Sequence, residues 1–167
     1  KLAKINSDGV PYAIFSYTAL VPWTYFSGAL TGASGSLLGA SGMMTKVYFP
    51  RLVIPIAPVM SKLVDFGIAF VILLLMMAYF GFMPSIQIIY LPLLILLMMI
   101  TASGMGMWLT AMAVQYRDIN YGMSFFVQLL MYASPVIFPL SIVPEKYKWV
   151  ILANPMSTIV ETFRYMV

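Results

Sequence analysis

Long stretches without charge alternate with short charged segments along this chain. No Lys, Arg, Asp or Glu occurs in residues 9–45, 66–116 or 119–144. A helix needs about 20 predominantly apolar residues to cross a bilayer. The three stretches therefore have room for one, two and one crossings. The pattern predicts an all-α integral membrane protein with transmembrane spans at about 12–38, 53–80, 86–114 and 121–140.

The first predicted span is aromatic where it begins and rich in small residues in its second half. The pairs Gly28/Gly32 and Gly35/Gly39 have the small-xxx-small spacing that lets a neighbouring backbone come close. We expect both pairs to pack against another helix. A hinge or the wall of a conduit is the alternative interpretation.

The segments that join the predicted spans are short. Residues 40–52 are amphipathic and contain Pro50, which ends any preceding helix because residues before proline avoid the helical region. We expect this segment to lie at the membrane surface. Residues 81–85 form an uncharged turn, and residues 115–120 form a polar link.

The tail at 141–167 carries more charge and predicts two short helices at, or dipping into, the membrane surface. Asn154 suits the N-cap and Pro155 the first position of a helix. We expect the second short helix to start there. Glu161 and Arg164, three residues apart, can pair on its surface.

Composition excludes several classes of protein. With 62% hydrophobic and 8% charged residues, the chain departs from soluble domains, which are about 25% charged. Without Cys or His it lacks the ligands and bases of thiol, zinc, haem and histidine chemistry. The net charge of +4 forms no basic patch for nucleic acid. We also find no phosphate-binding loop and no nucleophile–base pair, so we expect neither catalysis nor a bound cofactor or metal.

Lys62 and Asp65 are the charges that fall well inside a predicted span. Intramembrane charges usually face a bundle interior or a wet cavity and pair with one another. Their spacing of three residues allows a local ion pair. An ion or proton relay is the alternative, although no second acid lies within another span.

Aromatic side chains are candidates for the wall of a sugar conduit, because aromatic rings stack on the apolar faces of pyranose units. Contact with lipid and packing between helices are the alternatives for each. The candidates are Tyr17, Trp23, Tyr25, Phe26, Phe125, Phe126 and Tyr132.

Several segments in the same order resemble the permease subunits of polysaccharide-exporting ABC transporters, the type-2 exporters of O-antigen, capsule and teichoic acid. One departure is Ala40, near a position where the family often has Asn. The segments are 9–17, 20–27, the Lys-Val-Tyr-Phe-Pro-Arg stretch at 46–51, 116–119, 134–139, 154–156 and Phe163-Arg164.

The resemblance implies a six-helix subunit of which residues 1–167 are one permease domain, incomplete at both ends, holding helices two to five. It places the segments at 46–51 and 117–118 in the cytoplasm and both chain ends outside, an orientation that the balanced Lys and Arg counts leave open. It implies a second copy of the permease, two ATP-binding subunits that hold ATP and Mg²⁺, surrounding lipid, and a lipid-linked polysaccharide substrate. The location would be the bacterial inner membrane.

The resemblance also assigns roles to residues. An element at 40–52 would couple to the ATPase, the second cytoplasmic turn would stiffen the link before the last span, and the tail would form an outer gate. A plain basic anchor is the alternative for the coupling element. The coupling residues are Met43, Lys46, Tyr48, Phe49, Pro50 and Arg51; the turn residues are Tyr116, Arg117 and Asp118; and the gate residues are Pro135, Pro139, Asn154 and Pro155.

Three other functions remain open at this point. A type-2 permease for drugs or other lipids would share the fold. A channel or secondary transporter without an ATPase would show inverted repeats or several intramembrane charges, and we find neither in the sequence. A membrane scaffold would make no ATPase contact.

Overall fold

The computed structural model describes residues 12–44, 50, 52–81, 86–116, 118–134, 136 and 154–167. All regular secondary structure in these ranges is helical, which confirms the predicted all-α class. The elements are α1 (Tyr12–Gly39), α2 (Ser41–Met44), α3 (Val53–Tyr79), the 3₁₀ helix η1 (Ile86–Tyr90), α4 (Leu91–Gln115), α5 (Asp118–Ala133) and α7 (Pro155–Met166).

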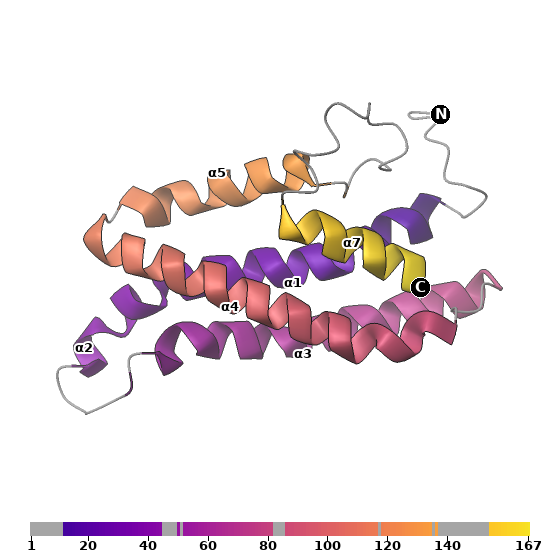
Figure 1. The fold of residues 1–167 in the computed structure, drawn as a ribbon, viewed down its shortest axis with the longest axis horizontal. Helices are drawn as coiled ribbons and strands as arrows, with labels where there is room; N and C mark the ends of the chain where they lie inside the picture. Colours follow the sequence, from indigo (N-terminus) through magenta and orange to yellow (C-terminus); the bar gives the residue numbers. More distant parts are fainter. Residues whose placement is uncertain are drawn as a thin grey trace.

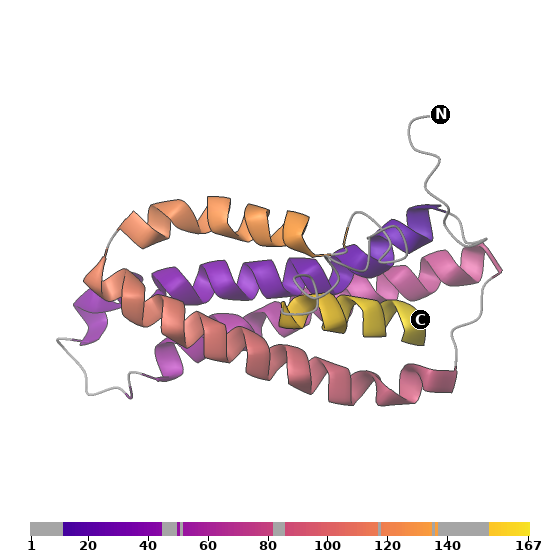
Figure 2. The same cartoon turned by 45° about the horizontal axis from the view of Figure 1, so that its top comes forward.

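Helix α1 is the centre of the bundle. The long helices α1, α3, α4 and α5 run along one axis, and α3, α4, α5 and α7 all contact α1 (Figures 1 and 2). The start of α1 and the end of α3 lie at one end of the bundle, whereas α2 and the link from α4 to α5 lie at the other. Helix α7 lies beside the half of α1 that is farther from α2.

Two helical stretches have the length and apolar composition to cross a membrane. These are Val53–Tyr79, of 27 residues, and Ile86–Gln115, of 30 residues, each with a mean hydropathy of 2.2. Helix α1 is 28 residues long but carries many Gly, Ser and Thr residues, and α5 has 16 residues. Within the described ranges two spans meet the test, so the expected total of four stays a prediction.

Small residues bring α1 close to its neighbours. A Cβ placed on Gly32 would lie 2.9 Å from the Cβ of Pro58 on α3, and one on Gly106 would lie 2.9 Å from the Cβ of Ala33. The Thr110 hydroxyl of α4 lies 2.8 Å from the Ala33 carbonyl oxygen, which adds a polar contact between α1 and α4. Close packing is therefore present where α3 and α4 meet α1.

The two glycine pairs behave differently. Gly28 and Gly32 both lie against α3, which confirms the predicted close approach. A Cβ on Gly35 or Gly39 would meet no described atom within 4 Å, so close packing of the second pair stays a prediction.

Large apolar side chains cover the outer faces of α3 and α4. Val64, Ile68, Val71 and Leu75 recur at helical spacing on α3 and are 55–66% exposed. Soluble monomers rarely present such wide apolar surfaces to water. This surface is the one expected to contact lipid. Leu93, Leu96, Leu97, Ile100 and Trp108 continue it on α4.

Helix α5 begins earlier than the sequence pattern predicts. Asp118, Ile119 and Asn120, expected in the polar link, form its first turn. An acidic residue is favourable there because the exposed amides at a helix N-terminus carry partial positive charge. Tyr116 ends α4 in an extended conformation, so the reversal between α4 and α5 is very short.

Candidate functional site

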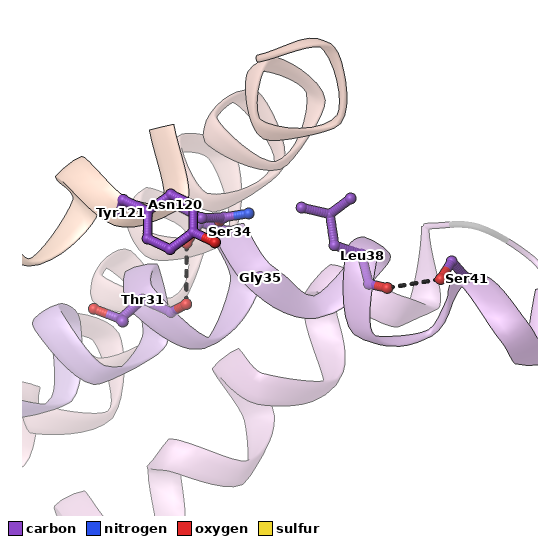
Figure 3. Close-up of a pocket in the computed structure, with 7 residues that line it drawn as sticks. All are labelled: Thr31, Ser34, Gly35, Leu38, Ser41, Asn120 and Tyr121. Atoms are coloured by element: carbon purple, nitrogen blue, oxygen red, sulfur yellow. Dashed lines mark hydrogen bonds between the residues drawn. The ribbon is translucent and has the colours of Figure 1, made fainter. Parts of the chain in front are cut away.

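A cavity of about 560 Å³ lies where α1, α2 and α5 meet (Figure 3). Its volume is within the range of about 300–1,000 Å³ that small-molecule pockets have. It is at the α2 end of the bundle. The lining residues are Thr31, Ser34, Gly35 and Leu38 of α1, Ser41 of α2, and Asn120 and Tyr121 of α5.

Three hydroxyl groups in the cavity wall donate their protons to backbone carbonyl oxygens of α1. Thr31 donates to the Ser27 carbonyl oxygen at 2.8 Å, Ser34 to that of Thr31 at 3.0 Å, and Ser41 to that of Leu38 at 2.8 Å. Figure 3 draws the last two bonds. A hydroxyl has one proton and two lone pairs, so these oxygens remain available as acceptors.

The wall contributed by α5 is an amide and an aromatic ring. The Oδ1 atom of Asn120 is buried and has no hydrogen-bond partner among the described residues. Its amide nitrogen points toward the side of the cavity where Leu38 lies (Figure 3). Tyr121 is 85% exposed and stands at the rim.

The predicted ion pair between Lys62 and Asp65 is present. The Lys62 Nζ donates to the Asp65 Oδ2 at 2.7 Å, which confirms a local pair. The lysine stem crosses Gly28 of α1, where a Cβ would lie 3.1 Å from the Lys62 Cδ. The two side chains are 41% and 62% exposed, so the pair lies on the outside of this chain rather than in its core.

The aromatic conduit candidates fall into two groups. Trp23, Tyr25 and Phe26 are at most 4% exposed and pack inside the bundle. Phe125 and Tyr132 on α5 are 64% and 59% exposed. Of the remaining two, Phe126 is 37% exposed and Tyr17 is partly buried. The α5 residues offer ring faces outside the chain, and a conduit role stays a prediction for all seven.

Helix α7 is inserted among the other helices. The ring of Phe163 is fully buried and makes edge contacts with Phe66 and Phe70 of α3, at centroid distances of 6.1 Å. Phe66 in turn contacts Tyr25 of α1 at 5.9 Å. One aromatic cluster, Tyr25, Phe66, Phe70 and Phe163, therefore joins α1, α3 and α7.

The start of α7 forms as the sequence predicts. Asn154 caps the helix, accepting from the Met156 amide at 3.1 Å through Oδ1, and Pro155 follows at the first position. The Asn154 amide nitrogen also donates to the Ser134 hydroxyl at 2.9 Å. Since Ser134 directly follows α5, this side chain ties the end of α5 to the start of α7.

The sequence predicted that Arg164 lies on the surface of its helix, and this prediction is wrong. Arg164 keeps an ion pair with Glu161 at 3.8 Å, but its side chain is only 10% exposed. The guanidinium lies 4.0 Å from the centroid of the Phe15 ring and donates to the Val136 carbonyl oxygen at 2.9 Å. Burial lowers the pKa of Arg164, and the Glu161 carboxylate acts in the opposite direction. A stacking contact with an aromatic face accounts for the inward turn.

Most of the expected coupling element is outside the described residues. The coupling residues outside the described part of the chain are Lys46, Tyr48, Phe49, Arg51 and the side chain of Met43. Arg117 of the second turn and Pro135 and Pro139 of the gate are also outside it. Pro50 is exposed, and its carbonyl oxygen accepts from the Val53 amide at 3.0 Å, at the start of α3. Tyr116 is 59% exposed and Asp118 is exposed, both at the same end of the bundle as α2.

The sequence analysis missed the cavity. Its signal in the sequence was a set of three hydroxyl residues, Thr31, Ser34 and Ser41, at a spacing that places them on one side of a helix. Tyr121 also precedes Phe125 by one helical turn and shares its face. Within the described part of the chain no cluster of three metal-ligating side chains occurs.

Comparison with known proteins gives consistent matches over nearly the whole chain. A family model described as ABC-2 type transporter matches residues 14–167. An O-antigen export system permease protein RfbA of Klebsiella pneumoniae is 26% identical over 154 residues, and one of Myxococcus xanthus is 26% identical over 155. Each alignment covers 92% of this chain and 60% of the relative, so the chain spans about 60% of the length of these curated relatives.

Proposed function

Since the chain belongs to the ABC-2 type transporter family, we propose that it is the transmembrane subunit of an ATP-driven exporter that moves lipid-linked polysaccharide across the bacterial inner membrane. In this proposal the permease is multi-pass and works as two copies with two ATP-binding subunits. ATP and Mg²⁺ bind to those subunits, and this chain performs no chemical step. The observation that carries the proposal is the similarity to O-antigen export permeases over 92% of the chain.

The packing of α1 supports a route for mechanical coupling. Residues 40–52 connect α1 to α3, and these two helices are held together where Gly28 and Gly32 meet Lys62 and Pro58. Two helices in such close contact move as one body, because packed interfaces deform little. A displacement of residues 40–52 by the ATPase would therefore move α1 and α3 together.

The aromatic cluster would pass this movement to α7. Phe163 of α7 packs on Phe66 and Phe70 of α3, and Phe66 packs on Tyr25 of α1. Arg164 adds a hydrogen bond to the segment after α5. In the proposed orientation α7 belongs to the outer gate, and its shift would open the outer end of the conduit.

The polar features of the bundle favour a hydrophilic cargo. The Lys62–Asp65 pair and the hydroxyl-lined cavity are both accessible from outside the chain. Exposed charge is costly against lipid and is tolerated at a water-filled path or a protein contact. A permease for an apolar drug would not need either feature, and therefore polysaccharide is the preferred cargo class.

The test is co-purification of an ATPase with the full-length permease from native membranes. The proposal predicts a stoichiometric ATP-binding subunit, and it predicts that the double substitution Lys46→Glu/Arg51→Glu releases it. The matched control is Lys146→Glu/Lys148→Glu, which makes the same charge change on the side proposed to face outward. This control should retain the ATPase.

Two results would contradict the proposal at different levels. Absence of any ATPase from the wild-type preparation would contradict an ABC exporter and favour a channel or a scaffold. An ATPase that stays bound to the Lys46→Glu/Arg51→Glu variant would leave the exporter but move the coupling contact away from residues 46–51.

A further inference from the structure

The described wall of the cavity between α1, α2 and α5 combines neutral polar groups with apolar surface. Among the described residues, its wall has hydroxyl oxygens, one side-chain amide and one aromatic ring, and none of these lining side chains is charged. Leu38 is the one large aliphatic side chain among the described lining residues, whereas exposed aliphatic side chains are frequent on the outer faces of α3 and α4. The wall is therefore suited to a polar ligand without charge.

The wall offers more hydrogen-bond acceptors than donors, and this limits the chemical class of ligand that suits it. The oxygens of Thr31, Ser34 and Ser41 have donated their protons to helical carbonyl groups and offer lone pairs to the cavity. A phosphate or carboxylate would face these lone pairs with no Lys or Arg among the described lining residues to neutralise it, and burying such an unpaired charge is costly. A ligand rich in hydroxyl donors would satisfy the same oxygens.

The α5 side of the wall complements such a ligand. The Asn120 amide nitrogen, directed toward the cavity, can donate to a ring or hydroxyl oxygen (Figure 3). The ring of Tyr121 stands at the rim, mostly exposed, where it can cover the apolar face of a pyranose unit. The cavity therefore combines a hydrogen-bond donor, several acceptors and an aromatic surface for stacking, which are the groups that bind a sugar ring.

Gly35 lines the cavity and has no side chain to project into it. A Cβ on Gly35 would meet no described atom within 4 Å, so there is space for a larger side chain at this position. The same is true of Gly39, one turn further along, which does not line the cavity. Gly39 is thus a matched control for substitutions at Gly35.

We propose that this cavity is a binding site for an uncharged sugar unit, recognised by its hydroxyl groups, at the α2 end of the bundle. The site rests on the proposed export function and specifies which part of the substrate the permease contacts here. It takes the glycan, while the anionic linkage of a lipid carrier is bound elsewhere.

The binding test uses the full-length permease with its ATPase in lipid nanodiscs. Residues 1–167 contain no Cys, so Gly35→Cys introduces a thiol whose alkylation rate can be followed on its peptide by mass spectrometry. The probes are the methyl glycosides of glucose, galactose and mannose, with sodium phosphate and phosphocholine as the anionic and headgroup probes. Gly39→Cys is the control.

The proposal predicts that at least one glycoside slows alkylation of Gly35→Cys several-fold and leaves Gly39→Cys unchanged, while phosphate and phosphocholine slow neither. Protection by phosphate or phosphocholine equal to that by the glycosides would overturn it and assign the cavity to a lipid headgroup. Lack of protection by every probe would also overturn it.

An export measurement separates this proposal from the proposed function. Gly35→Leu projects a bulky apolar side chain into the cavity and should reduce surface polysaccharide strongly, whereas Gly39→Leu should not, and both should keep the ATPase bound. Normal export by Gly35→Leu would overturn the sugar site while leaving the exporter intact. Failure of the wild-type permease to bind an ATPase would instead contradict the proposed function.

A second pair of variants changes the shape of the protein less, and it tests the site even if the glycine variants misfold. Thr31→Val removes one acceptor at nearly constant shape, and Thr24→Val removes an equivalent hydroxyl of α1 that lies outside the cavity. Both hydroxyls donate to carbonyl groups of their own helix, so the two substitutions should change the stability of α1 by similar amounts. Reduced export by Thr31→Val alone supports the site, and equal export by the two variants contradicts it.

Discussion

Individual glycines in this bundle differ in what surrounds them, and their environments decide how a substitution acts. Gly106 faces Ala33 of α1 so closely that an added Cβ would lie 2.9 Å away, while Gly104 on the same helix faces open space. Gly28 leaves room for the stem of Lys62. Such contacts show that small residues in α1 and α4 serve interhelical packing.

Gly106→Val should destabilise the permease by about 1–3 kcal/mol, because the larger side chain forces α4 away from α1. Gly104→Val makes the same change in helix propensity without the overlap and should have little effect. The measurement is thermal unfolding of the purified full-length protein. Equal unfolding temperatures for the two variants would contradict the close packing of α1 and α4.

Asn154 makes two separable contacts, one as a helix cap and one to Ser134. Asn154→Asp keeps the cap oxygen and loses the donor to Ser134, while Asn154→Ala loses both. Loss of the cap should cost about 1 kcal/mol. Asn154→Ala should therefore unfold at a lower temperature than Asn154→Asp, and the reverse order would contradict the assignment of Oδ1 as the cap.

At the scale of elements, α7 is the helix whose position the sequence describes least well. Its start at Asn154 and Pro155 follows from local capping chemistry, which is readable in sequence. The inward turn of Arg164 depends on Phe15 and Val136, residues of two other segments, and local spacing predicted an exposed ion pair instead. Local chemistry predicts where this helix begins, and tertiary contacts decide which face it buries.

Phe163→Ala should loosen α7, because it removes a fully buried ring from the aromatic cluster and leaves a cavity. Such substitutions cost about 3–5 kcal/mol. Limited proteolysis should then cut after the end of α5 faster than in the wild-type protein. Tyr165→Ala is the control, since Tyr165 is 76% exposed on the same helix. Equal cleavage rates in the two variants would show that Phe163 does not anchor α7.

At the scale of the whole molecule, the sequence predicts much of the fold and little of the site. The long apolar stretches before and after Gly81 predict α3 and α4 closely, because long apolar helices leave a continuous signal that the Lys62 and Asp65 of α3 do not hide. Gly81 itself has a φ of 74°, which glycine adopts readily. The cavity combines residues about 80 to 90 positions apart, and a single-helix pattern does not indicate which distant residues will meet.

The two ends of the bundle should lie on opposite sides of the membrane. Tyr79, at the end of α3, is 86% exposed, and Tyr116, at the end of α4, is 59% exposed at the opposite end of the bundle. In intact cells, with other thiols removed from the full-length protein, an impermeant reagent should label Tyr79→Cys. Tyr116→Cys should react only after permeabilisation. The opposite labelling pattern would invert the proposed orientation.

The most direct test of the account is the location of polysaccharide in the source organism after deletion of the full-length gene. The account predicts that polysaccharide disappears from the cell surface and accumulates inside. The wild-type gene should restore display, and the Lys46→Glu/Arg51→Glu variant should not. Unchanged surface polysaccharide in the deletion strain would contradict polysaccharide export as the function of this permease.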